Sequence, residues 1–118
     1  MTVEQLIGEY DIVGKNQDMD GSLYNGSLKL TLNDYNRIEA KWIIGDNQKQ
    51  FGTGFFKDNI LVINFSYKEE RNIFKGVVVY KCLTKDILEG FWSEKHGDPN
   101  FLGEENCFRK GTRKETVN

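Results

Sequence analysis

The chain has 118 residues, the length of one domain, and 38% of them are hydrophobic and 13% aromatic. This composition supplies enough apolar surface for a folded core and excludes an intrinsically disordered chain. The 16 basic and 18 acidic residues give a formal net charge of −2 at pH 7 and form no long basic run, which disfavours a nucleic-acid partner. No apolar segment approaches the roughly 20 residues that a membrane-spanning helix needs, so a membrane partner is also disfavoured.

The two cysteines, Cys82 and Cys107, lie far apart in the sequence and do not form a Cys-x-x-Cys pair. No stretch near the N-terminus combines a basic segment with an apolar one, as a secretory leader does. These features predict a cytoplasmic protein whose two cysteines are reduced and buried.

The first predicted element is one short helical turn at the N-terminus. Thr2 and Gln5 have the spacing of a capping box, in which each side chain accepts a hydrogen bond from the backbone N–H of the other residue. Leu6 follows this turn, and we expect it to plug one end of the fold that the rest of the chain forms.

Glycines recur along the rest of the chain with a period of about thirteen residues, and an apolar or aromatic residue stands two positions before most of them. Two intervals, from Gly26 to Gly52 and from Gly52 to Gly76, are about twice as long as the others. Halving them places one further position near the middle of each, at Ala40 and Asn64. The eight positions are Gly14, Gly26, Ala40, Gly52, Asn64, Gly76, Gly90 and Gly103, with steps of 12 to 14 residues. Such a step fits one strand of about nine residues and a tight turn, and a glycine in a strand allows the sharp bends that a small barrel needs. The series predicts an all-β fold, an eight-stranded antiparallel up-and-down meander β-barrel.

Alternating apolar residues indicate which face of each strand points inward. The strands over residues 27–32 and 37–44 carry their apolar side chains at even positions. This period of two is typical of strands and not of helices. From Gly14 to Gly90 the positions of the series are separated by even numbers of residues, so we expect even-numbered side chains to point inward in these strands. The last interval, from Gly90 to Gly103, is odd, so we expect odd-numbered side chains to point inward in the last strand.

Turn-type sequences separate the predicted strands. They lie at residues 18–21, 33–36, 45–47, 57–59, 68–72 and 84–86, and the longest loop covers residues 94–100. Asn25-Gly26 is itself a strong hairpin signal, and a turn there would shift the second strand by several residues. We assign residues 1–109 to a single barrel domain and residues 110–118 to a polar tail.

The residues at the two ends of the predicted barrel resemble those of the calycin group, which includes lipocalins and avidins. Lipocalins carry Gly-x-Trp at the start of the first strand, and a late arginine packs across that ring. Here Gly8-Glu9-Tyr10 and Arg109 occupy the corresponding places, with tyrosine in place of tryptophan. The resemblance implies that Arg109 lies over the Tyr10 ring. The segments 52–54, 76–80, 88–92 and 102–105 also look like those of small uncharacterised bacterial barrel proteins, and this likeness implies no activity.

With these inward-facing positions, the barrel interior contains several polar and aromatic side chains. They are Tyr10, Tyr24, Trp42, Asn64, Ser66, Tyr80, Trp92, Glu105 and Cys107. Polar groups that converge inside an aromatic wall are typical of a small-molecule site. The candidate ligand-binding residues are Trp42, Asn64, Tyr80, Trp92 and Glu105. The alternative is a filled core whose polar groups satisfy one another or a buried water. Glu105 is the most informative of them, because a carboxylate inside a barrel costs several kcal/mol unless it is paired or protonated. The alternative is that the last strand keeps an even-numbered inward face, with Glu104 inward or with both glutamates near the rim.

The chain offers little for metal, cofactor or nucleophile chemistry. GxGxxG, GxSxG and P-loop motifs are absent, so no cofactor and no catalytic residue are assigned. His96 is the only imidazole, and one histidine with two distant cysteines does not make a zinc site. Asn16-x-Asp18-x-Asp20-Gly21 is similar to the start of a calcium loop, but Ser27 stands where the last ligand would be a glutamate. A plain hairpin loop is favoured there, and no metal site is predicted.

Three hypotheses of function remain. The first is a module that binds a small, partly apolar ligand in the barrel interior. The second is a structural or interaction protein with a filled core, which forms a homodimer through the outer face of the fifth and sixth strands. Both strands are apolar on both faces, and the residues expected to point outward are Leu61, Ile63, Phe65, Val77 and Val79. The third and weaker one is a cofactor-free isomerase or cyclase that uses Glu105 and Tyr80 in acid–base chemistry. A pocket above about 300 Å³ would favour the first or the third, and a solid interior the second.

Overall fold

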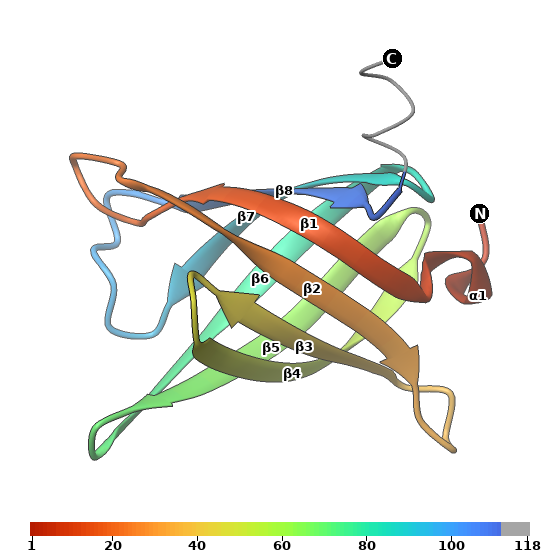
Figure 1. The fold of residues 1–118 in the computed structure, drawn as a ribbon, viewed down its shortest axis with the longest axis horizontal. Helices are drawn as coiled ribbons and strands as arrows, with labels where there is room; N and C mark the ends of the chain where they lie inside the picture. Colours follow the sequence, from red (N-terminus) through yellow and green to blue (C-terminus); the bar gives the residue numbers. More distant parts are fainter. Residues whose placement is uncertain (112–118) are drawn as a thin grey trace.

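The computed structural model describes residues 1–111 and shows a closed barrel of eight antiparallel strands with one short helix at the N-terminus (Figure 1). The elements are α1 (Val3–Leu6), β1 (Gly8–Lys15), β2 (Leu23–Leu32), β3 (Ile38–Ile44), β4 (Gln48–Lys57), β5 (Ile60–Glu69), β6 (Asn72–Thr84), β7 (Ile87–Glu94) and β8 (Gly103–Arg109). Strands that follow one another in the sequence are neighbours, and β1 pairs with β8. The predicted fold class is therefore confirmed. The predicted polar tail lies outside the described residues from position 112 onward.

The strong turn signal at Asn25-Gly26 lies inside a strand, because β2 runs through it without interruption. Gly26 opposes Ile12 of β1 on one side and Ile44 of β3 on the other. A Cβ at this position would lie 2.2 Å from the backbone oxygen of Ile43. The glycine therefore serves the close approach of two neighbouring strands and not a hairpin turn.

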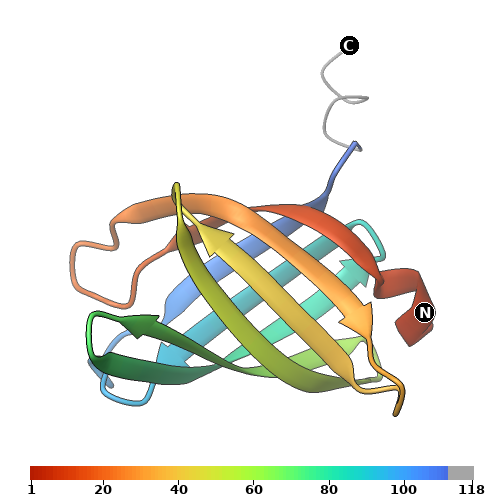
Figure 2. The same ribbon diagram turned by 60° about the horizontal axis from the view of Figure 1, so that its bottom comes forward.

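The connections between strands divide between the two ends of the barrel (Figure 2). One end, which we call the helix end, carries α1 and the turns β2–β3, β4–β5 and β6–β7. The other end, which we call the loop end, carries the connections β1–β2, β3–β4, β5–β6 and β7–β8. Leu6, the last residue of α1, is fully buried, as expected for a plug. The two longest connections, residues 16–22 and 95–102, both lie at the loop end.

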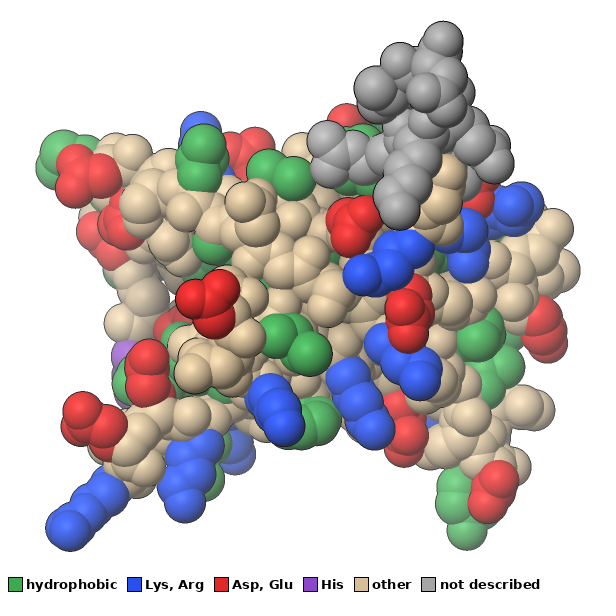
Figure 3. All heavy atoms as spheres, in the orientation of Figure 1, with side chains coloured by type: hydrophobic (Ala, Val, Ile, Leu, Met, Phe, Trp, Pro, Cys, Tyr) green, Lys and Arg blue, Asp and Glu red, His purple; other side chains and the backbone are tan. Residues whose placement is uncertain are grey.

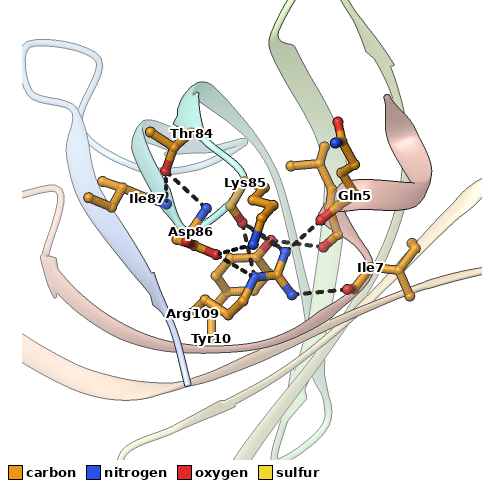
Figure 4. A network of polar contacts seen from close by, with 9 residues as sticks. Gln5, Ile7, Tyr10, Thr84, Lys85, Asp86, Ile87 and Arg109 are labelled. Carbon is orange, nitrogen blue, oxygen red and sulfur yellow. Dashed lines mark hydrogen bonds and ion pairs between the residues drawn. The ribbon is translucent and has the colours of Figure 1, made fainter. Parts of the chain in front are cut away.

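Arg109 ties together the segments that meet at the helix end (Figure 4). Its guanidinium donates hydrogen bonds to the backbone oxygens of Gln5, Ile7 and Lys85, at 2.6, 3.1 and 2.8 Å. Its Nε also lies 2.9 Å from a carboxylate oxygen of Asp86. One side chain from the last strand thus holds α1, the start of β1 and the β6–β7 turn in place.

The same guanidinium lies over the ring of Tyr10, with its central carbon 4.8 Å from the ring centroid. The Tyr10 hydroxyl accepts a hydrogen bond from Arg109 Nη2 at 2.8 Å and donates to the backbone oxygen of Leu6 at 2.8 Å. Burial raises the pKa of Tyr10 to about 12, although the positive charge of Arg109 opposes the rise. The contact that the calycin resemblance implied is therefore present.

Strand β5 faces inward with the opposite parity from the prediction. Directly opposed residues of an antiparallel pair lie on the same face of the sheet. Lys57 opposes Ile60 across a two-residue turn, so each even-numbered residue of β4 opposes an odd-numbered residue of β5. Both turn residues, Asp58 and Asn59, have positive φ (51° and 63°), as a type I′ turn requires. The two-residue connection between β5 and β6 then reverses the parity again.

As a result, five residues of β5 lie on the opposite face of the sheet from the one predicted. Leu61, Ile63 and Phe65 lie in the core, with 0%, 0% and 7% of their surface exposed. Asn64 and Ser66 lie on the outer face of the barrel, where Asn64 is exposed and Ser66 half-buried. The predicted interior positions of Asn64 and Ser66 are therefore wrong.

The predicted dimer face is also wrong, because three of its five residues are these core residues. Val77 does point outward, with 41% of its surface exposed, and Val79 lies half-buried on the same face. The outer face carries a different apolar row, in which Phe55 opposes Val62, Val62 opposes Val79, and Val79 opposes Phe91. The homodimer hypothesis thereby loses most of the residues on which it was based.

Cys82 and Cys107 are free and buried, as predicted. They oppose the same residue, Leu88, from the two sides of β7, so they belong to strands that are not neighbours. Burial raises the pKa of Cys82 to about 11.

Acidic and basic side chains are interspersed on the face of the barrel that Figure 3 shows, with no area of a single sign across it. Among residues 1–111, no helix is long and apolar enough to cross a membrane.

Candidate functional site

A cavity of about 140 Å³ lies inside the barrel at its loop end. Its lining consists of aromatic rings (Tyr24, Trp42, Phe65, Tyr67, Trp92), amides (Asn16, Gln48, Gln50), carboxylates (Glu94, Glu105) and aliphatic side chains (Ile44, Val78). Trp42 and Glu105 are buried, whereas Gln48 and Glu94 at the strand ends are half-buried. The cavity therefore leads from the solvent at the loop end to Glu105 in the interior.

Glycines on both neighbouring strands make room around Glu105. In the sheet register, Glu105 of β8 opposes Gly14 of β1 on one side and Gly90 of β7 on the other. The ring of Tyr24 covers Gly14 and the ring of Tyr80 covers Gly90, because a Cβ at either glycine would come within 2.0 and 2.5 Å, respectively, of ring atoms. Each tyrosine crosses its glycine and reaches the carboxylate. The glycine period thus serves the site as well as the bending of the strands.

The Glu105 carboxylate accepts hydrogen bonds from three neutral donors. The Tyr24 hydroxyl donates to Oε1 at 2.9 Å, the Trp42 indole Nε1 donates to Oε2 at 3.1 Å, and the Tyr80 hydroxyl also donates to Oε2. The Trp92 indole donates to the Tyr24 hydroxyl at 2.9 Å and extends the network to a second indole. Within residues 1–111, every buried side-chain nitrogen and oxygen has a partner. The protein therefore satisfies this network by itself, yet the network borders an open cavity.

The aromatic wall of the cavity is one edge-to-face cluster. The ring centroids of Trp42 and Phe65 lie 6.1 Å apart, and those of Phe65 and Trp92 lie 6.2 Å apart. Tyr24 packs against Trp92 with its centroid 6.4 Å away. Such geometry is favourable because the positive edge of one ring meets the negative face of the next. Trp42 and Trp92 therefore lie at the same end of the barrel, as predicted, with Phe65 between them.

Gln17 holds together the two long loops beside the cavity. Its amide nitrogen donates to Ser93 Oγ at 2.9 Å and to two backbone oxygens of the loop over residues 95–102, at 2.9 and 3.0 Å. Its side-chain oxygen accepts a hydrogen bond from the backbone N–H of Glu94 at 2.9 Å. The rim is therefore an ordered structure, although it is built from loops.

Among residues 1–111, no lysine, arginine or histidine lines the cavity. Burial raises the pKa of Glu105 above its usual value, while the hydrogen bonds from Tyr80, Tyr24 and Trp42 oppose the rise. Burial and the neighbouring carboxyl also raise the pKa of Tyr24 and Tyr80, so both hydroxyls remain protonated donors. The interior thus combines a carboxyl group, which no cationic side chain of residues 1–111 neutralises, with neutral donors and aromatic rings.

The raised pKa of Glu105 predicts a specific dependence of stability on pH. Above about pH 4.5 the carboxyl ionises more readily in the unfolded chain than in the native one, so its contribution to the free energy of unfolding falls until the native pKa is passed. We expect the wild-type protein to lose more stability than Glu105→Gln as the pH rises from about 4 to about 8. Urea denaturation of both proteins across this range measures the difference. Parallel stability curves would contradict the raised pKa.

The structure brings together four of the five predicted site residues. Trp42, Trp92 and Glu105 line the cavity, and Tyr80 lies behind Glu105 with its hydroxyl on the carboxylate. Asn64 does not belong to this group, because it points out from β5.

Sequence reasoning missed several residues of the cavity wall. Tyr24 was expected inside the barrel but was not assigned to the site. Phe65 was expected outside, and the signal that would have placed it inside was the two-residue turn at Asp58-Asn59. Gln48, Gln50, Tyr67 and Glu94 complete the wall near the rim, and no motif marks them.

A larger hollow of about 990 Å³ lies on the outer surface over β3 to β7. Its lining includes Phe51, Asn64 and Val77 together with three lysines. Glu105 is the only buried acidic or basic side chain among residues 1–111, and it is not part of this hollow. The interior cavity is the better candidate site, because a buried carboxylate and the hydroxyl and indole groups that donate to it border this space.

No family model and no curated protein matches this chain. Solved structures share its fold. A redesigned β-barrel, mFAP1, bound to DFHBI, has 16% sequence identity and a TM-score of 0.68 over 91% of this chain and 96% of that one. EF1p2_mFAP2b bound to DFHBI has 15% identity and a TM-score of 0.67, over 91% and 95% of the two chains. A de novo designed fluorescence-activating β-barrel has 13% identity and a TM-score of 0.66, over 93% and 100%. These similarities concern the fold alone, and the resemblance to calycins in particular stays a prediction.

Proposed function

We propose that this protein binds a small, partly apolar molecule in the cavity at the loop end of the barrel. The observation that carries the proposal is the convergence of Trp42, Trp92 and Glu105 on one cavity that leads to solvent. Apolar walls with a few placed polar groups are typical of small-molecule sites. Two solved barrels with this fold are bound to DFHBI, which supports the view that a barrel of this fold accommodates a small ligand.

The volume of the cavity limits the size of the ligand. At about 140 Å³ it is smaller than the roughly 300 Å³ at which pockets for drug-sized molecules begin, yet the interior is not solid. An engineered cavity of about 150 Å³ in another protein holds one benzene molecule. A ligand of that size, with one polar group directed toward Glu105, suits this space.

The two tryptophans provide the test, because Trp42 and Trp92 are the only indoles in the chain and both line the cavity. We expect a compound from a set of small ring-shaped molecules to change the intrinsic fluorescence saturably. Trp42→Phe removes both an indole wall and a hydrogen bond to Glu105, and it should weaken binding about tenfold when heat release is measured instead of fluorescence. Phe91→Ala is the matched control, because Phe91 lies beside Trp92 on the outer face with 49% of its surface exposed.

The control variant should bind as the wild-type protein does. If no compound of the set binds to the wild-type protein, the proposed function is wrong. Equal weakening by Trp42→Phe and Phe91→Ala would place the binding site outside the cavity.

A further inference from the structure

The charges inside the cavity have one sign. Glu105, with 5% of its surface exposed, and Glu94 both line it, and no basic side chain of the described part of the chain does. The groups that contact the Glu105 carboxylate are two hydroxyls and an indole, all of them neutral. Arg109 belongs to the same strand, but its guanidinium is directed to α1 and the β6–β7 turn at the other end of the barrel. Within residues 1–111, an ionised carboxylate in this position therefore has no counterion.

The carboxylate also retains capacity to accept a hydrogen bond. Its two oxygens together offer about four acceptor positions, and the protein supplies three donors. Two of these donors share Oε2, and only the Tyr24 hydroxyl donates to Oε1. One acceptor position thus remains at Oε1 for a donor from outside the protein.

The walls of the cavity favour a cation as well. The faces of indole and phenyl rings attract positive charge within about 6 Å of the ring centroid, most strongly where water is excluded. Trp42, Phe65 and Trp92 form one cluster with centroid separations of 6.1 and 6.2 Å, so a molecule in this cavity lies close to several rings at once. The surface of the protein adds little to this preference, because charges of both signs are interspersed on it (Figure 3) and the net charge is only −2.

We propose that the ligand is a small organic cation, a protonated primary amine on an apolar body of about the size of benzene, whose N–H group donates to Oε1 of Glu105 while Trp42 and Trp92 surround the body. This inference rests on the proposed function, because it names the chemical class of the ligand for the same cavity. A cation beside Glu105 favours the ionised carboxylate and offsets the effect of burial on its pKa.

Three compounds with the same ring and different polar groups test the inference on the wild-type protein. Cyclopentylamine is a cation at neutral pH, cyclopentanol is neutral and cyclopentanecarboxylate is an anion. We expect the cation to bind at least tenfold more tightly than the alcohol, and the anion not to bind, when each is titrated calorimetrically. If the alcohol or the carboxylate binds as tightly as the amine, the proposal of a cation is wrong although the cavity does bind ligands.

Substitutions at two neighbouring residues then test whether the preference for the cation depends on the Glu105 carboxylate. Glu105→Gln removes the interior charge and keeps the shape of the side chain, and it should reduce the affinity for cyclopentylamine at least tenfold with less than threefold change for cyclopentanol. Glu104→Gln removes the same charge one residue away, where the side chain is 59% exposed and faces solvent, and it should leave both affinities unchanged. Near-ultraviolet circular dichroism checks that both variants are folded.

The outcomes separate this inference from the proposed function. One outcome is that none of the three compounds binds, but another small molecule changes the tryptophan fluorescence and binds more weakly to Trp42→Phe. In that case the proposed function stands, and the proposal that the ligand is a cation is wrong. Equal loss of amine binding in the two variants would mean that the overall charge attracts the cation, and it would overturn the role of Glu105.

Discussion

Replacing Arg109 with alanine is expected to lower the free energy of unfolding by about 2–4 kcal/mol. The Arg109 side chain is only 19% exposed and donates to three backbone oxygens, so its loss removes several hydrogen bonds that hold the helix end together. The substitution also removes the contact with the Tyr10 ring. Urea denaturation of the two proteins measures the difference. Arg109→Lys should recover less than half of the loss, because an ammonium group cannot reach all of these acceptors at once.

The matched control for this experiment is Lys110→Ala. Lys110 is the next residue, and its ion pair with Asp11 spans 3.4 Å between side chains that are 44% and 46% exposed. Exposed pairs of this kind contribute little, so the change should stay within about 0.5 kcal/mol. If Lys110→Ala destabilised the protein as much as Arg109→Ala, a general effect of charge and not the network of Figure 4 would explain the loss.

The second large effect is expected for Gly103→Val, at about 3 kcal/mol. Gly103 of β8 opposes Trp92 of β7, and the indole lies directly over it. A Cβ at position 103 would come within 2.0, 2.4 and 2.5 Å of three indole atoms, so the ring must leave its place. The substitution should therefore destabilise the protein, shift the tryptophan emission to longer wavelength and remove one wall of the cavity, despite the high strand propensity of valine.

Glu104→Val introduces the same side chain at the adjacent position, which points outward, and should change stability by less than about 1 kcal/mol. In the background of Trp92→Leu, the substitution Gly103→Val should cost much less than in the wild-type protein, because the smaller side chain removes the steric conflict. An equal cost in both backgrounds would show that the glycine is needed for backbone geometry and not for the indole.

The sequence by itself determined the strand number, the closure of the barrel and the inward face of most strands. These features depend on local properties: an alternation with period two, a glycine in most strands, and turn sequences between them. The odd parity of β8 followed from the spacing of Gly90 and Gly103, and the structure confirms it, because Glu105 is buried. The stacking of Arg109 on Tyr10 followed from the resemblance and is also present.

The inward face of β5 required the pairing of strands across two turns. Halving the gap between Gly52 and Gly76 placed a reference position at Asn64, but the residue opposite both glycines is Phe65. A shift of one residue in register moves every side chain of a strand to the other face. The length and type of the turn at Asp58-Asn59 decide that shift. The sequence indicated a turn at residues 57–59, but the register depends on a two-residue turn with positive φ at both positions.

Only the tertiary structure decided that the interior contains a cavity and which side chains surround it. Composition and parity placed Trp42, Trp92 and Glu105 inside, but the free volume depends on how far each ring leans across a neighbouring strand. Tyr24 and Tyr80 lean over glycines and meet at one carboxylate, which leaves about 140 Å³ unfilled between the indoles and the loops. Seven strands, β2 to β8, contribute residues to the lining of the cavity. The cavity volume is the small difference between the space that the barrel encloses and the side chains that fill it.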